Sequence, residues 1–157
     1  MIYDILAPKW IREIMSEGFT EIVATWKGES AFVGQNALGG TVQMGSLDGK
    51  PGVGPMQLLL VAIAGCTGGD ISSILKKKRV DLSAMQVRVR GKRADNYPMI
   101  WTEIHVTYLL WGRSIKPKDV ERAIELSENK YCSVGIILGK SAKITSEYLI
   151  LKPGETI

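Results

Sequence analysis

The stretch from Gly54 to Arg79, GPMQLLLVAIAGCTGGDISSILKKKR, constrains this chain more than any other part. A proline suits the first position of a helix, so the pattern predicts one long helix from Pro55 to about Lys78. Its first half is apolar on nearly every side, and such a helix must be buried in protein or in lipid. Three glycines surround Cys66, and each costs about 1 kcal/mol inside a helix. They indicate that a backbone or a ligand approaches closely.

Length and charge indicate a single globular domain and exclude some partners. The chain has 157 residues, 20 basic against 16 acidic side chains and a net charge of +4. Its densest basic cluster, Lys76 to Arg79, suits the C-terminus of a helix, where cations interact favourably with the dipole. Nucleic-acid binding requires a wider basic face, so we expect no nucleic-acid partner.

We predict a cytoplasmic protein with no membrane partner. Met1 to Ser16 has no continuous apolar core and contains Lys9 and Arg12, so it does not resemble a signal peptide. The longest apolar run, Leu58 to Cys66, is about half the length that a membrane-spanning helix needs. In the cytoplasm, two cysteines are core residues or a redox pair rather than a structural disulfide.

The remaining periodicity predicts an α+β fold. We expect residues 1–18 to be an N-terminal extension that contains a short amphipathic helix, Pro8–Glu17, and residues 19–157 to form one domain. After residue 18, segments in which apolar and polar residues alternate, or that are rich in β-forming residues, predict strands, and one further amphipathic segment predicts a helix. The expected elements are a meander of short strands at Phe19–Trp26, Ala31–Gln35 and Gly40–Met44, a hairpin of Leu82–Arg93 and Ile100–Trp111, a helix at Ser114–Lys130 and a last strand at Ala142–Leu151.

No motif indicates a metal or a cofactor. The single histidine, His105, falls on the polar face of its strand, and the cysteines form no CxxC motif, so a zinc site is not expected. The glycine-rich segment Gly49 to Pro55 fits neither nucleotide-binding pattern, and its two prolines lack donor N–H groups.

The pattern alone leaves both roles open for the two cysteines. Cys66, surrounded by Leu, Val, Ile and Ala, can pack as a small hydrophobic side chain, and its pKa is expected to be raised unless a cation faces it. Cys132 precedes a helical turn predicted at Val134–Leu138. Because a helix start lowers a thiol pKa, Cys132 is expected to be the more reactive of the two. The spacing does not determine whether they meet.

Two segments resemble the OsmC/Ohr superfamily, in the version found in its YhfA-like branch. Pro55 to Leu75 is similar to the central helix of the superfamily, and SENKYCSVGIIL, Ser127 to Leu138, is similar to its second cysteine motif. The resemblance implies an OsmC-like fold, in which antiparallel sheets wrap around long central helices in an intertwined homodimer. It also implies reduction of small apolar organic hydroperoxides, as in oxidative-stress defence. Cys66 would be the peroxidatic thiol, Cys132 the resolving thiol and an unidentified thiol the reductant.

The sequence lacks two features of the peroxidase branches, a glutamate at the start of the central helix and an arginine in the N-terminal strands. Those branches have a glutamate directly after the helix-opening proline, where this chain has Met56. They also hold the thiolate with an arginine from the N-terminal strands, whereas Arg79 is the one arginine between Glu13 and Val87. Without an Arg–Glu pair, little thiolate forms at neutral pH. The activity is therefore expected to be weak or specialised, and the alternative is a non-enzymatic dimeric binding module with an apolar pocket and structural cysteines.

Overall fold

The computed structural model describes residues 18–157, which divide between Pro55 and Met56 into two compact units. The helix expected at Pro8–Glu17 lies outside the described residues, as does the N-terminal extension apart from Gly18. The assignment of residues 19–157 to one domain stays a prediction.

The first unit is a three-stranded antiparallel meander. Its strands are β1 (Ile22–Gly28), β2 (Ala31–Asn36) and β3 (Thr41–Met44), in that spatial order, so the expected meander is confirmed. Gly45 follows β3 with a φ of +73°, and a side chain there would collide with the carbonyl group of Ser30. Glycine is therefore required where the chain turns away from the sheet.

This meander buries very little of its own apolar surface. Ala31 is the one buried hydrophobic residue among the described residues of this unit. Its large apolar side chains that remain exposed are Phe19, Ile22, Val23, Trp26, Phe32, Leu38, Val42 and Val53. Three strands need a covered hydrophobic face for independent stability, so the sheet requires something else to pack against it.

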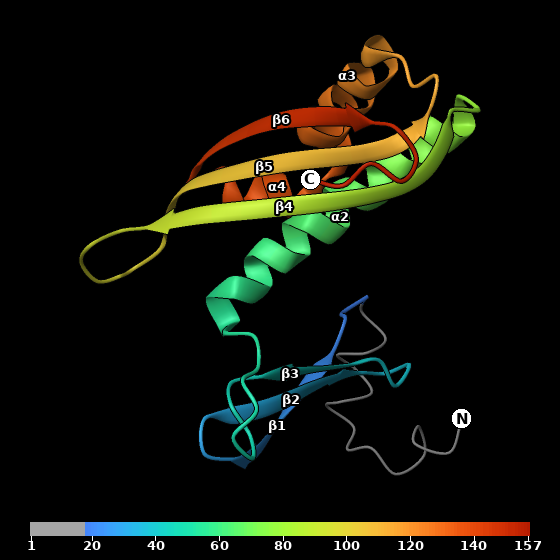
Figure 1. Cartoon of the computed structure of the whole chain (residues 1–157). Helices are drawn as coiled ribbons and strands as arrows, with labels where there is room; N and C mark the ends of the chain where they lie inside the picture. Colours follow the sequence, from blue (N-terminus) through green and yellow to red (C-terminus); the bar gives the residue numbers. More distant parts are fainter. Residues whose placement is uncertain (1–17) are drawn as a thin grey trace. The chain divides into compact units, whose positions relative to one another are not determined.

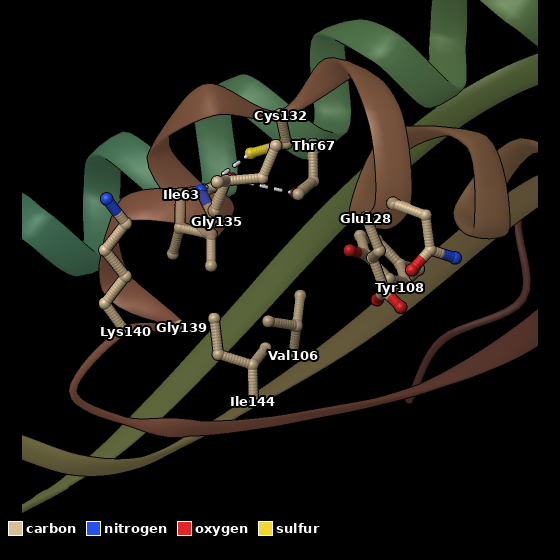
Figure 2. Close-up of a pocket in the computed structure, with 12 residues that line it drawn as sticks. Ile63, Thr67, Val106, Tyr108, Glu128, Cys132, Gly135, Gly139, Lys140 and Ile144 are labelled. Carbon is tan, nitrogen blue, oxygen red and sulfur yellow. Dashed lines mark hydrogen bonds between the residues drawn. The ribbon is translucent and has the colours of Figure 1, made fainter.

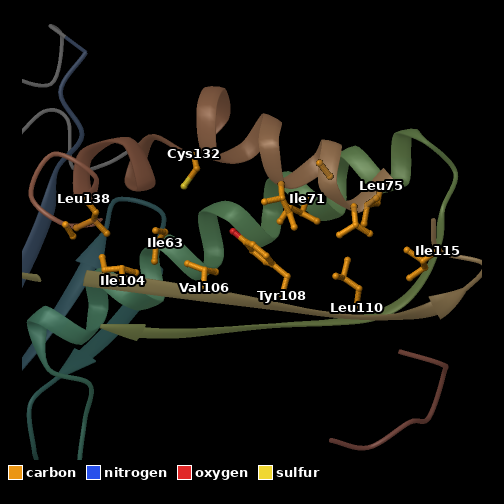
Figure 3. Packing of buried hydrophobic residues seen from close by; sticks show 14 of the residues in the cluster. Ile63, Ile71, Leu75, Ile104, Val106, Tyr108, Leu110, Ile115, Cys132 and Leu138 are labelled. Atoms are coloured by element: carbon orange, nitrogen blue, oxygen red, sulfur yellow. The ribbon is translucent and has the colours of Figure 1, made fainter. Parts of the chain in front are cut away.

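The second unit is a mixed sheet with helices on one face (Figures 1 and 3). In chain order it contains α2 (Pro55–Lys77), β4 (Asp81–Arg93), β5 (Trp101–Arg113), α3 (Pro117–Leu126), the π-helix η1 (Ser127–Tyr131), α4 (Ser133–Leu138) and β6 (Lys143–Leu151). The predicted hairpin is confirmed as the antiparallel pair β4–β5. β6 runs parallel to β5, because the helical crossover returns the chain to the same end of the sheet.

The long helix α2 packs one face against this sheet. Ile63, Ile71 and Leu75 are buried there with the inward side chains of β5, among them Tyr108 and Leu110 (Figure 3). By length and composition alone α2 could cross a membrane, but the core helix of a soluble domain passes the same test. In this structure one face of α2 packs on the sheet, and 28% of its most apolar window is buried.

Within the second unit, the opposite side of α2 packs against no other element. We call this side the outer face of α2; its residues include Leu59, Val61, Ala62, Gly65 and Gly69, all exposed. Of the three glycines near Cys66, Gly68 is explained by the sheet, since a Cβ there would lie 3.3 Å from Val87. Among the described residues, a Cβ at Gly65 or Gly69 would meet nothing within 4 Å, so the packing described above does not explain these two.

The second predicted helix differs from expectation at both ends. It begins at Pro117 rather than Ser114, since Ser114 has a φ of +56° and Lys116 is the N-cap. After Leu126 the chain widens into the π-helix η1, which ends at Tyr131. Such short π segments are rare and occur frequently at functional sites.

Candidate active site

The two cysteines, far apart in the sequence, come together on the helical layer of the second unit. Cys66 lies at the middle of α2 and is half-buried, whereas Cys132 is completely buried; both are free thiols. Their side chains are neighbours, and the proximity of Cys66 is one cause of the raised pKa of the Cys132 thiol. The structure thus resolves the question that the spacing left open.

Cys132 caps the helix α4, as the sequence predicts. Its backbone N–H donates to the Ser127 carbonyl at 2.8 Å and thereby closes the π turn. Its sulfur accepts a hydrogen bond from the Gly135 N–H at 3.2 Å. The thiol is therefore held at a fixed place by both of its flanking helices.

The expected reactivity of Cys132 is wrong. Burial raises the pKa of its thiol to about 12, and the neighbouring Cys66 and the Asp70 carboxyl group act in the same direction. The hydrogen bond from Gly135 opposes this change but does not overcome it. The helix start still favours the thiolate, but loss of water around the sulfur disfavours the charged form by more.

Asp70 links α2 to the segment that carries Cys132. It lies one helical turn after Cys66, as the sequence predicts, and its Oδ2 accepts a hydrogen bond of 2.9 Å from the Ser127 hydroxyl. Ser127 is completely buried, and its carbonyl is the acceptor for the Cys132 N–H. The chain Asp70–Ser127–Cys132 therefore fixes the π-helix relative to α2 and sets the position of the second thiol.

A cavity of about 420 Å³ lies on the sheet side of Cys132 (Figure 2). Its walls combine apolar side chains, among them Ile63, Val106 and Ile144, with polar ones, and Lys140 lies at one end. At the other end, the Tyr108 hydroxyl and Oε1 of Glu128 are buried without a hydrogen-bond partner among the described residues. Burial raises the pKa of Tyr108, so this hydroxyl keeps its proton and is a hydrogen-bond donor.

Sequence reasoning missed the functional potential of Tyr108 and Glu128. Alternation along Ile100–Trp111 places Tyr108 on the same face as Val106 and Leu110, and the structure shows that this face is buried, but the pattern assigns no role to the hydroxyl group. A signal was available, because a tyrosine placed between Val106 and Leu110 must bring a polar group into an apolar layer. The position of Glu128 depends on the π turn, which the pattern does not reveal.

Comparison with known proteins identifies the family to which this arrangement belongs. Residues 47–147 match the family described as OsmC-like protein. The chain belongs to the OsmC-like family. It is 34% identical over 126 residues to Protein YhfA of Escherichia coli K12, an alignment that covers 80% of this chain and 94% of YhfA. These matches support the OsmC/Ohr superfamily and its YhfA-like branch, the resemblance stated from the two cysteine motifs.

Solved structures support the OsmC-like fold. A hypothetical protein from Aquifex aeolicus VF5 is 31% identical, with a TM-score of 0.76 over 85% of this chain and 97% of that one. The organic hydroperoxide resistance protein OhrB of Bacillus subtilis is 14% identical, with a TM-score of 0.57 over 83% of this chain and 98% of that one. At this identity the second match shows the fold alone.

Two other residues singled out in the sequence, Met56 and His105, make their hydrogen bonds away from the two thiols. The Met56 carbonyl accepts a hydrogen bond of 3.1 Å from the Trp101 indole, and Met56 packs against the core. His105 lies on the outer face of the sheet, where it contacts Thr145 and Glu147. Within residues 18–157, no lysine or arginine hydrogen bonds to either sulfur, and no group of three or more His, Cys, Asp or Glu could hold a metal ion.

Proposed function

We propose that this protein is a thiol-dependent hydroperoxide reductase that acts in the cytoplasm on small apolar organic hydroperoxides. The observation that carries the proposal is the pair of neighbouring free thiols at the two cysteine motifs of the family. The similarity in fold to a protein named for organic hydroperoxide resistance supports the choice of substrate class.

Cys66 is the proposed peroxidatic residue, because it is the less buried of the two thiols. Its thiolate attacks the terminal oxygen of the hydroperoxide, the O–O bond breaks and the alcohol leaves with a proton, which gives a sulfenic acid at Cys66. The Cys132 sulfur then attacks the Cys66 sulfur, an S–S bond forms and water leaves. An external dithiol returns both cysteines to the reduced form, and the reaction needs no metal or organic cofactor.

The second step is expected to be slow at neutral pH. With a thiol pKa of about 12, Cys132 is a thiolate in roughly one molecule in 10⁵ at pH 7. The attack therefore requires removal of the thiol proton, and the resolving step rather than the first oxidation would limit turnover. This agrees with the weak or specialised activity expected from Met56.

A homodimer is part of the proposal, and two separate surfaces support it. The outer face of α2 exposes Leu59 and Val61 by 37% and 56%, next to two glycines that have open space around them. In the other unit, the meander leaves large apolar side chains such as Trp26 exposed. Exposed apolar surface of this kind marks an interaction site, and a second copy of the chain is the occupant that the resemblance implies.

The test is consumption of cumene hydroperoxide in the presence of dithiothreitol. The wild type is expected to consume the peroxide, and Cys66→Ser is expected to lose this activity. A double variant, Cys66→Ser with Ser73→Cys, is the matched control, because it keeps a thiol on the exposed part of α2 two turns away. Equal rates in the wild type and Cys66→Ser would refute the enzymatic proposal.

The role of Cys132 is tested by trapping. In Cys132→Ser the resolving thiol is gone, so the sulfenic acid at Cys66 should persist and add dimedone in a 1:1 ratio, detected by mass spectrometry. In the wild type, dimedone should be largely excluded and the protein should lose two hydrogen atoms as the disulfide forms. Dimedone adducts of equal yield in both proteins would contradict the resolving role.

The alternative is a dimeric binding module with structural cysteines, and the cavity beside Cys132 favours it. In that case Cys66 is expected to react slowly with a thiol probe, at a rate that changes little with pH. Native mass spectrometry of freshly purified protein would then detect a bound apolar molecule.

A further inference from the structure

The cavity on the sheet side of Cys132 has the composition of a binding site. Ligand pockets typically measure about 300–1,000 Å³ and combine apolar walls with a few polar groups that orient the ligand. This cavity of about 420 Å³ has such walls, formed by Ile63, Val106 and Ile144. An apolar cavity of about 150 Å³ already binds benzene, so there is room here for a ring with a substituent.

Thr67, Asn129 and Lys140 also line the cavity, but two other polar groups, on Tyr108 and Glu128, are the informative ones. Buried polar atoms normally have hydrogen-bond partners, and an unpaired one costs about 1–3 kcal/mol. Yet the Tyr108 hydroxyl, in a side chain with 0% exposure, and Oε1 of Glu128 both lack a partner among the described residues, and they are neighbours at one end of the cavity. One is a donor and the other is an acceptor.

A hydroxyl group satisfies both atoms at once. Its oxygen accepts the proton of Tyr108, and its own proton is donated to the carboxyl group of Glu128. A purely apolar molecule would leave both atoms unpaired. An ether would pair with Tyr108 alone because it has no proton to donate.

We propose that this cavity is a binding site for small apolar molecules that carry one hydroxyl-type group, with the hydroxyl held between Tyr108 and Glu128 and the apolar part against Ile63, Val106 and Ile144. Alcohols, phenols and hydroperoxides share this chemistry. The inference goes beyond the proposed reductase activity, because it concerns reversible binding on the sheet side of Cys132 and requires no reaction of either thiol.

Three probes of nearly the same shape separate the contributions of the ligand's hydrogen-bond donor, its acceptor and its apolar part to the binding affinity. Benzyl alcohol has a donor and an acceptor, benzyl methyl ether has an acceptor only, and toluene has neither. Binding is measured by titration against the methyl NMR signals of Ile63, Val106 and Ile144, with the exposed Ile137 as the internal control. Benzyl alcohol should bind most tightly, the ether less tightly and toluene least, with shifts at the three cavity residues and none at Ile137.

Variants of Tyr108 and Glu128 test whether these two residues cause the preference for benzyl alcohol over toluene. Tyr108→Phe should weaken benzyl alcohol binding about fivefold and leave toluene unchanged, since one neutral hydrogen bond is lost. Glu128→Gln should weaken the alcohol about tenfold with little effect on the ether. Matched controls are Tyr97→Phe and Glu125→Gln, which change an exposed tyrosine and an exposed glutamate and should leave all three affinities unchanged.

Three results would each overturn the proposal. The first is equal affinity for toluene and benzyl alcohol. The second is an unchanged affinity for benzyl alcohol in Tyr108→Phe. The third is a crystal structure at saturating benzyl alcohol in which only a water molecule lies between Tyr108 and Glu128. Because none of the probes is a peroxide, these results are independent of reductase activity. Loss of peroxide turnover with intact alcohol binding would refute the proposed enzyme and leave this site standing. Turnover of the closely related hydroperoxide, benzyl hydroperoxide, unaffected by Tyr108→Phe would place catalysis outside the cavity.

Discussion

Alanine at Gly65 or Gly69 changes the stability of this protein in opposite directions, depending on whether a second helix lies against the outer face of α2. Within one chain, a Cβ at either position meets nothing within 4 Å. The only effect is then the better helix propensity of alanine, which raises the free energy of unfolding by about 0.8–1.0 kcal/mol per site. For a chain of this size, that corresponds to a Tm increase of about 2–4 °C.

A second copy reverses this sign. Helices that contact through glycine approach closely, and an added methyl group in such a packed interface costs about 1–3 kcal/mol. A symmetric dimer contains each substitution twice, so the loss exceeds the gain in helix propensity. Under the proposed homodimer, Gly65→Ala and Gly69→Ala should therefore lower Tm by several degrees and shift the dimer towards monomer.

Two measurements decide between these outcomes. Tm is followed by circular dichroism over a hundredfold range of protein concentration, and mass is determined by light scattering during gel filtration. Gly68→Ala is the control, because its Cβ would lie 3.3 Å from Val87 within the same chain, so its effect should not depend on concentration. If Gly65→Ala and Gly69→Ala each raise Tm by about 2–4 °C and leave the mass unchanged, no second helix packs there and the argument from these glycines is wrong.

Three further predictions concern the thiol site and the cavity. Because burial raises the pKa of Cys132 to about 12, disulfide formation after a peroxide pulse should accelerate about tenfold per pH unit from pH 7 to 9, measured by rapid-quench mass spectrometry; a rate independent of pH would contradict this. Tyr108→Phe should raise the free energy of unfolding in urea by about 1–3 kcal/mol, because it removes an unpaired buried hydroxyl, whereas a decrease would show that this group is satisfied in solution. Ser127→Ala should lower stability by about 1–3 kcal/mol and slow disulfide formation, since it removes the link from Asp70, and an unchanged rate would show that the link does not position Cys132.

The parts of this fold that could be predicted from sequence are those set by local periodicity. Alternation of apolar and polar residues predicts the β4–β5 hairpin and places Tyr108 on the apolar face of β5. The antiparallel pairing of the two strands and the complete burial of Tyr108 confirm both. Pro55 marked the start of α2, and the position of Cys132 before an apolar turn marked the start of α4. Each of these features depends on residues close together in the chain.

The features that could not be predicted depend on which segments become neighbours. The parallel pairing of β6 with β5 follows from the path of the helical crossover, for which no single residue is a signal. The π turn at Ser127–Tyr131 is stabilised by tertiary contacts, among them the hydrogen bond from Ser127 to Asp70, 57 positions earlier. The meeting of the thiols and the placement of Glu128 near Tyr108 depend on that turn.

Cys132 shows why a local rule can predict a position correctly and its chemistry wrongly. The N-cap geometry is present, and the Gly135 N–H does donate to the sulfur. A dipole and one hydrogen bond stabilise a thiolate by a modest amount, whereas complete removal of water disfavours the charged form by more. The same burial that makes Cys132 a poor nucleophile protects it from direct attack by peroxide, while Cys66 keeps partial access to solvent. Under the proposed mechanism, unequal burial of two neighbouring thiols is sufficient to give them different roles.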